Sequence, residues 1–78
     1  MKESDKYLKF VCWEDEDAVY VGYCPDLFPF GGVCHGKTEE GTFQELCELV
    51  REEVQERLRS GKDLPPVTTR AMRDAIPA

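Results

Sequence analysis

The sequence has no hydrophobic run long enough to cross a membrane. A spanning helix needs about 20 apolar residues, whereas the apolar runs of this 78-residue chain are far shorter. The charged N-terminus, residues 1–6, is not followed by an apolar segment of signal-peptide length. We therefore expect a cytoplasmic protein that does not contact membranes and whose four cysteines are reduced thiols.

Basic residues are scarce. Ten lysines and arginines stand against sixteen acidic residues, which gives a net charge of −6. Proteins that bind nucleic acid neutralise its phosphates with Lys and Arg. The composition therefore disfavours direct contact with nucleic acid and is better suited to a basic protein partner.

The chain also lacks the spacing of a metal site. Structural zinc is usually held by cysteine pairs two to four residues apart, and none is present. Cys34 and His35 are neighbours on a predicted strand, so their side chains should point to opposite faces. Cys12 and Cys47 fall at apolar positions, as small buried hydrophobic residues do. We predict no metal and no cofactor.

Patterns typical of catalysis are missing as well. A catalytic imidazole needs a nucleophile and an orienting group, and His35, the only histidine, is more simply a structural or solvated residue. The acidic residues at 14–17 are adjacent in sequence, which favours a solvated turn over a metal-binding cluster. Gly31-Gly32 does not open a helix, so it is no phosphate-binding loop. We expect no catalytic residues and no enzyme activity.

The residues that are present predict one small α+β domain. Aromatic and β-branched residues indicate strands at 7–13 and 18–24, joined by a charged loop built on a type I turn. One face of this hairpin should meet a helix and the other a second subunit. Pro25 ends the second strand because it has no N–H to donate. Residues 33–36 form a short third strand or extended chain.

The helix is predicted to begin after Thr38, whose side chain can cap it, and to stop at Gly61. Apolar residues at three- and four-residue spacing define one buried stripe: Phe43, Leu46, Cys47, Val50, Val54 and Leu58. The opposite side is polar: Glu45, Glu48, Arg51, Glu52, Gln55, Glu56 and Arg59.

Self-association is expected for two reasons. So short a chain has a small core, and small domains often need a disulfide, a metal or a second subunit. The helix, at roughly 32 Å, is also longer than strands of about 23 Å. Val54 and Leu58 should then overhang the sheet and be covered by the tail, through Met72, Ala75 and Ile76, or by another subunit.

Phe28 and Phe30 lie in the connection that follows Pro25. Aromatic residues in a loop either close one end of the core or anchor an interface. The candidate interface residues are therefore Phe28, Phe30, Val54 and Leu58. Residues 64–67 are an edge strand or an extended linker, and Thr68 or Thr69 could cap a short last helix through Ile76.

The segment Tyr20-Val21-Gly22-Tyr23-Cys24-Pro25-Asp26-Leu27, followed by Gly36-Lys37-Thr38-Glu39-Glu40 at the start of the helix, resembles the HicB-like antitoxin family. The resemblance covers residues 6–67 and leaves 68–78 as a tail. The matching positions are Tyr20, Pro25, Asp26, Leu27, Gly36 and Thr38. The sequence departs from the family pattern in a longer turn at 28–32, in Lys37 and in Gly41.

This resemblance implies a truncated ribonuclease H-like fold without nuclease activity. Three antiparallel strands precede the helix, and a fourth strand, here 64–67, returns beside the first. It also implies a dimer or tetramer that binds a small basic mRNA-cleaving toxin of the HicA type and covers its active site. Many members carry a C-terminal DNA-binding domain, and since this sequence ends at Ala78 we expect it to lack one. The alternative is an orphan homo-oligomeric domain that binds another protein or a small ligand.

Overall fold

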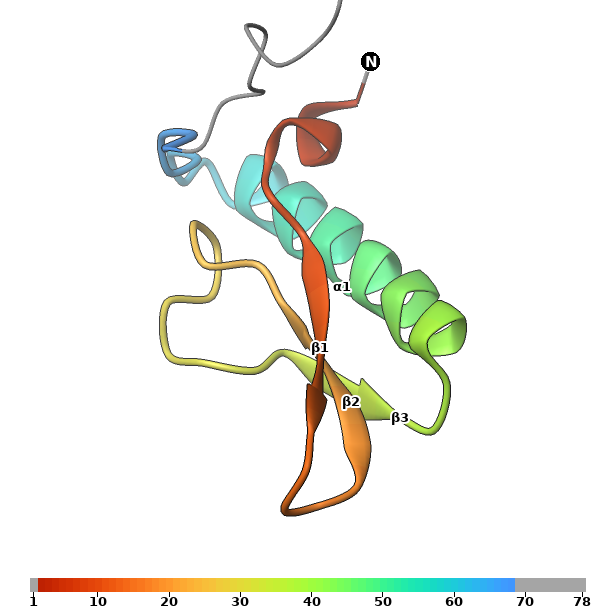
Figure 1. Cartoon of the computed structure of the whole chain (residues 1–78). Helices are drawn as coiled ribbons and strands as arrows, with labels where there is room; N and C mark the ends of the chain where they lie inside the picture. The colour runs from red at the N-terminus through yellow and green to blue at the C-terminus, as the bar shows by residue number, and fades with distance from the viewer. Residues whose placement is uncertain (1, 69–78) are drawn as a thin grey trace, which may run out of the picture.

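The computed structural model describes residues 2–68 and has an α+β architecture. A short 3₁₀ helix, η1 (Glu3–Lys6), precedes the strands β1 (Phe10–Glu14), β2 (Val19–Tyr23) and β3 (Cys34–Gly36), and the helix α1 (Glu39–Arg59) follows (Figure 1). The strands form one antiparallel sheet in the order β1-β2-β3. The helix packs on one face of this sheet, so the predicted fold class is confirmed.

The β1–β2 hairpin is closed by the acidic turn. The Ala18 N–H donates to the Asp15 carbonyl at 3.4 Å, and Ala18 adopts a positive φ of 52°. In the sheet, Val11 pairs with Gly22, which pairs with Cys34. Residues opposite one another share a face, and here Val11 and Cys34 both contact the core beneath the helix.

The helix begins and ends as its sequence predicts. The Thr38 side chain accepts from the Gly41 N–H at 3.0 Å. At the other end Gly61 has a φ of 73°, and the N–H groups of Gly61 and Lys62 donate to the carbonyls of Leu58 and Arg57. This is the Schellman arrangement, in which a left-handed residue satisfies the last carbonyls of a helix.

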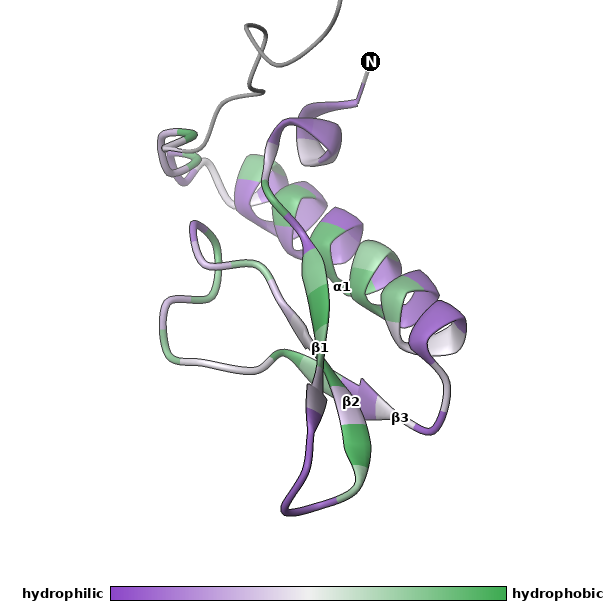
Figure 2. Ribbon diagram, viewed as in Figure 1, coloured by the Kyte–Doolittle hydropathy of each residue, from purple (hydrophilic) through white to green (hydrophobic). Residues whose placement is uncertain are grey.

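The buried stripe of α1 is narrower than predicted. Leu46, Val50 and Val54 are buried, together with Thr42, which the apolar pattern missed. These residues recur every four positions and form the row that faces the sheet. Phe43 is 41% exposed and Cys47 is half-buried, since each lies one position further round the helix. The polar side is exposed as expected, and Figure 2 shows hydrophobic and hydrophilic residues alternating along α1.

Val54 is covered by parts of the chain that were not expected to reach it. It is only 1% exposed, because segments outside the sheet extend the core at this end. Ser4 and Tyr7, from the N-terminal segment, are buried, and Leu64 and Val67 pack against the same core cluster. Leu58, one turn further on, is 50% exposed. Residues 72–76, which were predicted to cover Val54 and Leu58, lie outside the described residues.

The predicted fourth strand is also corrected: residues 64–67 belong to no strand of the sheet. Pro65 and Pro66 have no N–H to donate to a ladder. The segment is held instead by the Tyr7 hydroxyl, which donates to the Pro65 carbonyl at 2.6 Å. Tyr7 lies outside β1, which starts at Phe10, three residues later than expected. The predicted last helix, through Ile76, lies beyond the described residues, and among these no helix is long and apolar enough to cross a membrane.

Candidate functional site

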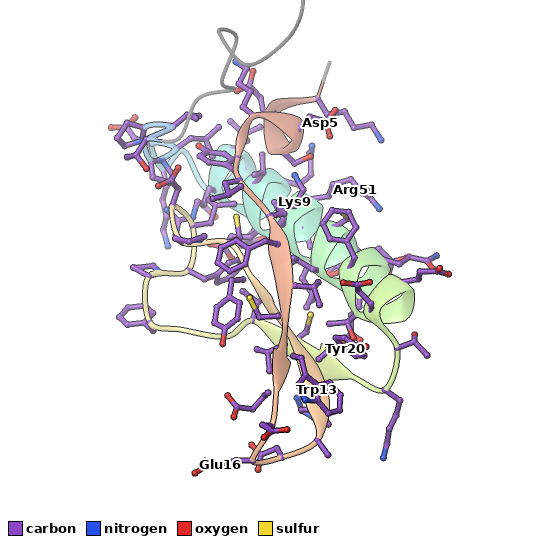
Figure 3. The ribbon with its side chains drawn as sticks, in the orientation of Figure 1. Asp5, Lys9, Trp13, Glu16, Tyr20 and Arg51 are labelled. Carbon is purple, nitrogen blue, oxygen red and sulfur yellow. The ribbon has the colours of Figure 1, made fainter. Side chains whose placement is uncertain are left out.

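The residues that match the family pattern in β2 and the following turn have structural roles. The Tyr20 ring lies edge-on to Trp13 of β1, with centroids 5.0 Å apart (Figure 3). After Pro25, the N–H groups of Leu27 and Phe28 both donate to the Cys24 carbonyl, at 3.2 and 2.8 Å. This turn points Leu27 into the core, where it is buried.

Gly36 and Thr38 determine how the chain passes from β3 into α1. A Cβ atom at Gly36 would lie 2.6 Å from Thr42 Oγ1, which is closer than atoms in contact can approach. Thr42 itself donates its hydroxyl to the Thr38 carbonyl at 2.7 Å. The first turn of α1 therefore packs directly on the end of β3, and a side chain at position 36 would separate them.

Asp26 joins the turn after β2 to the end of the described chain. Its carboxylate accepts from the Thr68 hydroxyl at 2.6 Å and from the Thr68 N–H at 3.0 Å. These hydrogen bonds, the side-chain bond above all, lower the pKa of Asp26. We call the Asp26–Thr68 and Tyr7–Pro65 contacts the C-terminal clasp, because they hold residues 64–68 against the domain. No local sequence signal predicts contacts between residues this far apart.

The candidate interface residues do not gather on one surface. Val54 is part of the core, and Phe28 packs against the core cluster from the loop. Phe30 is 99% exposed. Of the two loop aromatics, Phe28 thus closes the core and Phe30 projects from the loop. Leu58, near the end of α1, is half-exposed. Of the four candidate interface residues, Phe30 and Leu58 are therefore the two that are exposed enough to anchor an interface.

An apolar groove of about 620 Å³ runs between β1 and the N-terminal half of α1. We call it the edge groove, because β1 is an edge strand of the sheet. The strand contributes Phe10 and Val11. The helix contributes both apolar and polar residues, namely Glu39, Glu40, Phe43, Gln44, Cys47 and Arg51. Sequence analysis missed this groove because it assigned Phe43 and Cys47 to the core.

A second surface is the acidic face of α1, which we define as Glu45, Glu48 and Glu52. All three side chains are exposed. Their spacing of three and four residues places them on one side of the helix. Among the described residues none of them takes part in an ion pair, since the helix ion pairs join Arg57 to Glu53 and Arg59 to Glu56. These carboxylates are therefore available to a cationic partner.

The thiols and the histidine are dispersed. Burial raises the pKa values of Cys24 and Cys34, which keeps both thiols protonated and weakly nucleophilic at neutral pH. Cys34 is buried next to the Thr42 carbonyl, whereas its neighbour His35 is exposed on the other face of the sheet. Residues 2–68 contain no group of three side chains placed to hold a metal ion.

Comparisons of the chain with protein-family models, with curated proteins and with solved structures gave no match. The fold and the surfaces therefore define a class only: a small α+β domain with one sheet face covered by a helix, an apolar groove at the sheet edge and an acidic helix face.

Proposed function

We propose that the protein is a HicB-like antitoxin-type binding module that neutralises a small basic mRNA-cleaving toxin of the HicA type by covering its active site. The observation that carries this proposal is the acidic face of α1. Glu45, Glu48 and Glu52 present unpaired carboxylates to solvent. A positive partner would be steered to them and held by charge complementarity.

The family pattern adds support, because the matching residues occupy positions where the fold needs them. Gly36 allows the close packing of β3 on α1, and Thr38 caps the helix. The element order β-β-β-α is that of the family up to the end of the helix. The net charge of −6 has the sign that a basic partner requires.

The test is a binding titration against the small basic product of an adjacent reading frame. Glu48→Lys combined with Glu52→Lys changes the net charge from −6 to −6 + 4 = −2 and reverses the acidic face. We expect the dissociation constant to rise about a hundredfold, as when charged contacts across an interface are made repulsive.

A matched control distinguishes the effect of charge at the acidic face on binding from the effect of the net charge. Glu16→Lys combined with Asp17→Lys makes the same net change in the exposed β1–β2 turn, away from the acidic face, and should weaken binding far less. Failure of the wild-type protein to bind the basic product would contradict the proposal. Equal losses in both double variants would contradict the assignment to the acidic face.

The alternative is an orphan homo-oligomeric domain that binds another protein or a small ligand. The edge groove favours this reading, since ligand sites are concave, mostly apolar and provided with a few polar groups. An adjacent gene that encodes no small basic protein would favour the orphan domain over the antitoxin module.

A further inference from the structure

Trp13 and Tyr20 form an aromatic pair across the β1–β2 hairpin. They lie directly opposite each other in the sheet, and their ring planes meet at 66° with the centroids 5.0 Å apart. Figure 3 shows the two side chains next to each other. Two rings inclined in this way form two walls of a corner. The rings of Phe10 and Tyr23, the other aromatic pair of the hairpin, are stacked at only 20° and form no such corner.

Both walls of this corner retain surface that a ligand can reach. Trp13 is 52% exposed, although tryptophan side chains are highly buried on average. Tyr20 is only partly buried. Within residues 2–68, neither ring belongs to the core cluster or to the residues packed against it. The fold therefore holds the two rings in place without covering them.

Asp15 fixes the Trp13 ring and brings a negative charge to it. The Trp13 Nε1–H donates to Asp15 Oδ1 at 3.2 Å. Because an indole has a single N–H group, this hydrogen bond favours one orientation of the ring. In the part of the chain that the structure describes, Asp15 takes part in no ion pair. The corner thus combines two aromatic faces with an unpaired carboxylate.

This combination suits an organic cation of rounded shape. The faces of aromatic rings carry negative charge density and attract cations. A guanidinium group is flat and stacks on a single ring, and a primary ammonium group has several N–H donors that need acceptors. A quaternary ammonium group has no donor and presents methyl groups on all sides. It can therefore contact both walls at once.

We propose that Trp13, Tyr20 and Asp15 form a binding site for a quaternary ammonium group. The methyl groups rest against both rings, and the Asp15 carboxylate balances the charge. The same chemistry occurs in free solutes such as choline and in the side chain of trimethyllysine. This site does not rest on the proposed antitoxin function, because it lies on the hairpin and not on α1.

The test uses the fluorescence of Trp13, which is the only tryptophan of the chain. Titration of the purified full chain with choline chloride should change this fluorescence saturably, with a dissociation constant of about one millimolar. Sodium chloride at the same concentrations controls for ionic strength. The neutral tert-butyl analogue of choline, in which carbon replaces the nitrogen, should bind at least about tenfold more weakly. The flat cation methylguanidinium should also bind more weakly than choline.

Substitutions at Tyr20 test the second wall. Tyr20→Leu leaves the Trp13 reporter in place and should raise the dissociation constant for choline by about tenfold. Tyr20→Phe keeps the ring and should bind choline as well as the wild type does. Tyr23→Leu is the matched control, because it removes another partly buried tyrosine of β2 that is not part of the corner. Circular dichroism of each variant verifies the fold.

The carboxylate is tested on the surface, where a substitution does not disturb the core. Asp15→Asn keeps an oxygen acceptor for the Trp13 N–H but removes the charge, and should raise the dissociation constant about two- to fivefold. Asp17→Asn removes the same charge from the same turn. Asp17 lies beside Val19 and His35 on the other face of the sheet, so this variant should bind choline almost as the wild type does.

A short peptide that contains trimethyllysine, compared with the same peptide containing lysine, distinguishes the two sources of the cation. Tighter binding of the trimethyllysine peptide than of choline assigns the site to a methylated protein, and tighter binding of choline assigns it to a free solute. The lysine peptide should bind more weakly than either.

The proposal would be overturned if choline gave no saturable change in the millimolar range. Equal binding of choline and its neutral analogue would also overturn it, because the contact would then be apolar only. These titrations contain no basic protein. Their failure would leave the proposed antitoxin function unaffected, and failure of the chain to bind a basic protein would leave this site intact.

Discussion

At the scale of single residues, two backbone positions adopt the left-handed conformation for opposite reasons. Gly61 has a φ of 73° and ends the helix, where glycine carries no steric cost. Ala18 has a φ of 52° in the acidic turn, where its Cβ is unfavourable. The Ala18 side chain is exposed, so nothing in the core depends on it. One position thus suits its residue, and the other stores strain.

Replacing Ala18 with glycine and replacing Gly61 with alanine should change the stability of the fold in opposite directions. Ala18→Gly should raise the free energy of unfolding by about 0.5–1 kcal/mol, and Gly61→Ala should lower it by about 1 kcal/mol. Nothing lies within 4 Å of a Cβ built at Gly61, so the loss there is a backbone effect alone. Urea unfolding at one fixed protein concentration measures both. A lower stability of Ala18→Gly would mean that unfolded-state entropy outweighs the relief of strain.

The Asp26 carboxylate should make the C-terminal clasp sensitive to acid. The hydrogen bonds from Thr68 lower the pKa of Asp26 in the folded protein. The clasp is therefore fully formed above the ordinary pKa of an aspartate and is lost as the pH falls through the lowered value. The NMR amide shift of Thr68 should follow this titration.

Asp26→Asn removes the titrating group, so the acid-dependent change at Thr68 should vanish. Asp63→Asn removes another exposed carboxylate near the same segment and should leave that change in place. A Thr68 amide shift that stays constant across the acidic range in the wild-type protein would rule out the clasp in solution.

At the scale of elements, α1 organises the domain because its four-residue row faces the sheet. Leu46, Val50 and Val54 are buried in this row. The same helix presents the edge groove on one side and the acidic face on another. A single element therefore supplies core, groove and charged surface, and substitutions on its different sides should have separable effects.

Replacing a buried and a half-exposed leucine of α1 with alanine tests whether the sides of the helix contribute differently to stability. Leu46→Ala should cost about 2–5 kcal/mol, because a fully buried leucine leaves a cavity. Leu58→Ala, at a half-exposed position, should cost under about 1 kcal/mol. Urea unfolding measures both losses of stability. Trimethylamine N-oxide in the buffer favours the folded state, so the less stable variant remains folded enough for the measurement. Similar losses in the two variants would mean that Leu58 is also buried in solution.

The sequence predicts those elements whose determinants are local. Thr38 and Gly61 bound the helix, Pro25 ends the second strand, and alternating residues define the hairpin. Features fixed by distant contacts were not predictable. The burial of Val54 depends on Ser4, Tyr7 and residues 64–67, which no periodicity connects to the helix. Phe43 and Cys47 fit a helical apolar stripe as well as Leu46 does, and only the orientation of α1 on the sheet shows that they line a groove.

At the scale of the whole molecule, the net charge of −6 favours association with a basic partner. The acidic face of α1 offers such a partner exposed carboxylates that take part in no ion pair within the described residues.

The most direct measurement is RNA cleavage by the small basic partner protein, titrated with the purified chain. Neutralisation by occlusion predicts that cleavage falls in proportion to added protein and stops at one chain per partner molecule. The Glu48→Lys, Glu52→Lys double variant should require a large excess. Cleavage that continues at the wild-type rate when the partner is fully bound would contradict the central claim that this protein covers the active site of its target.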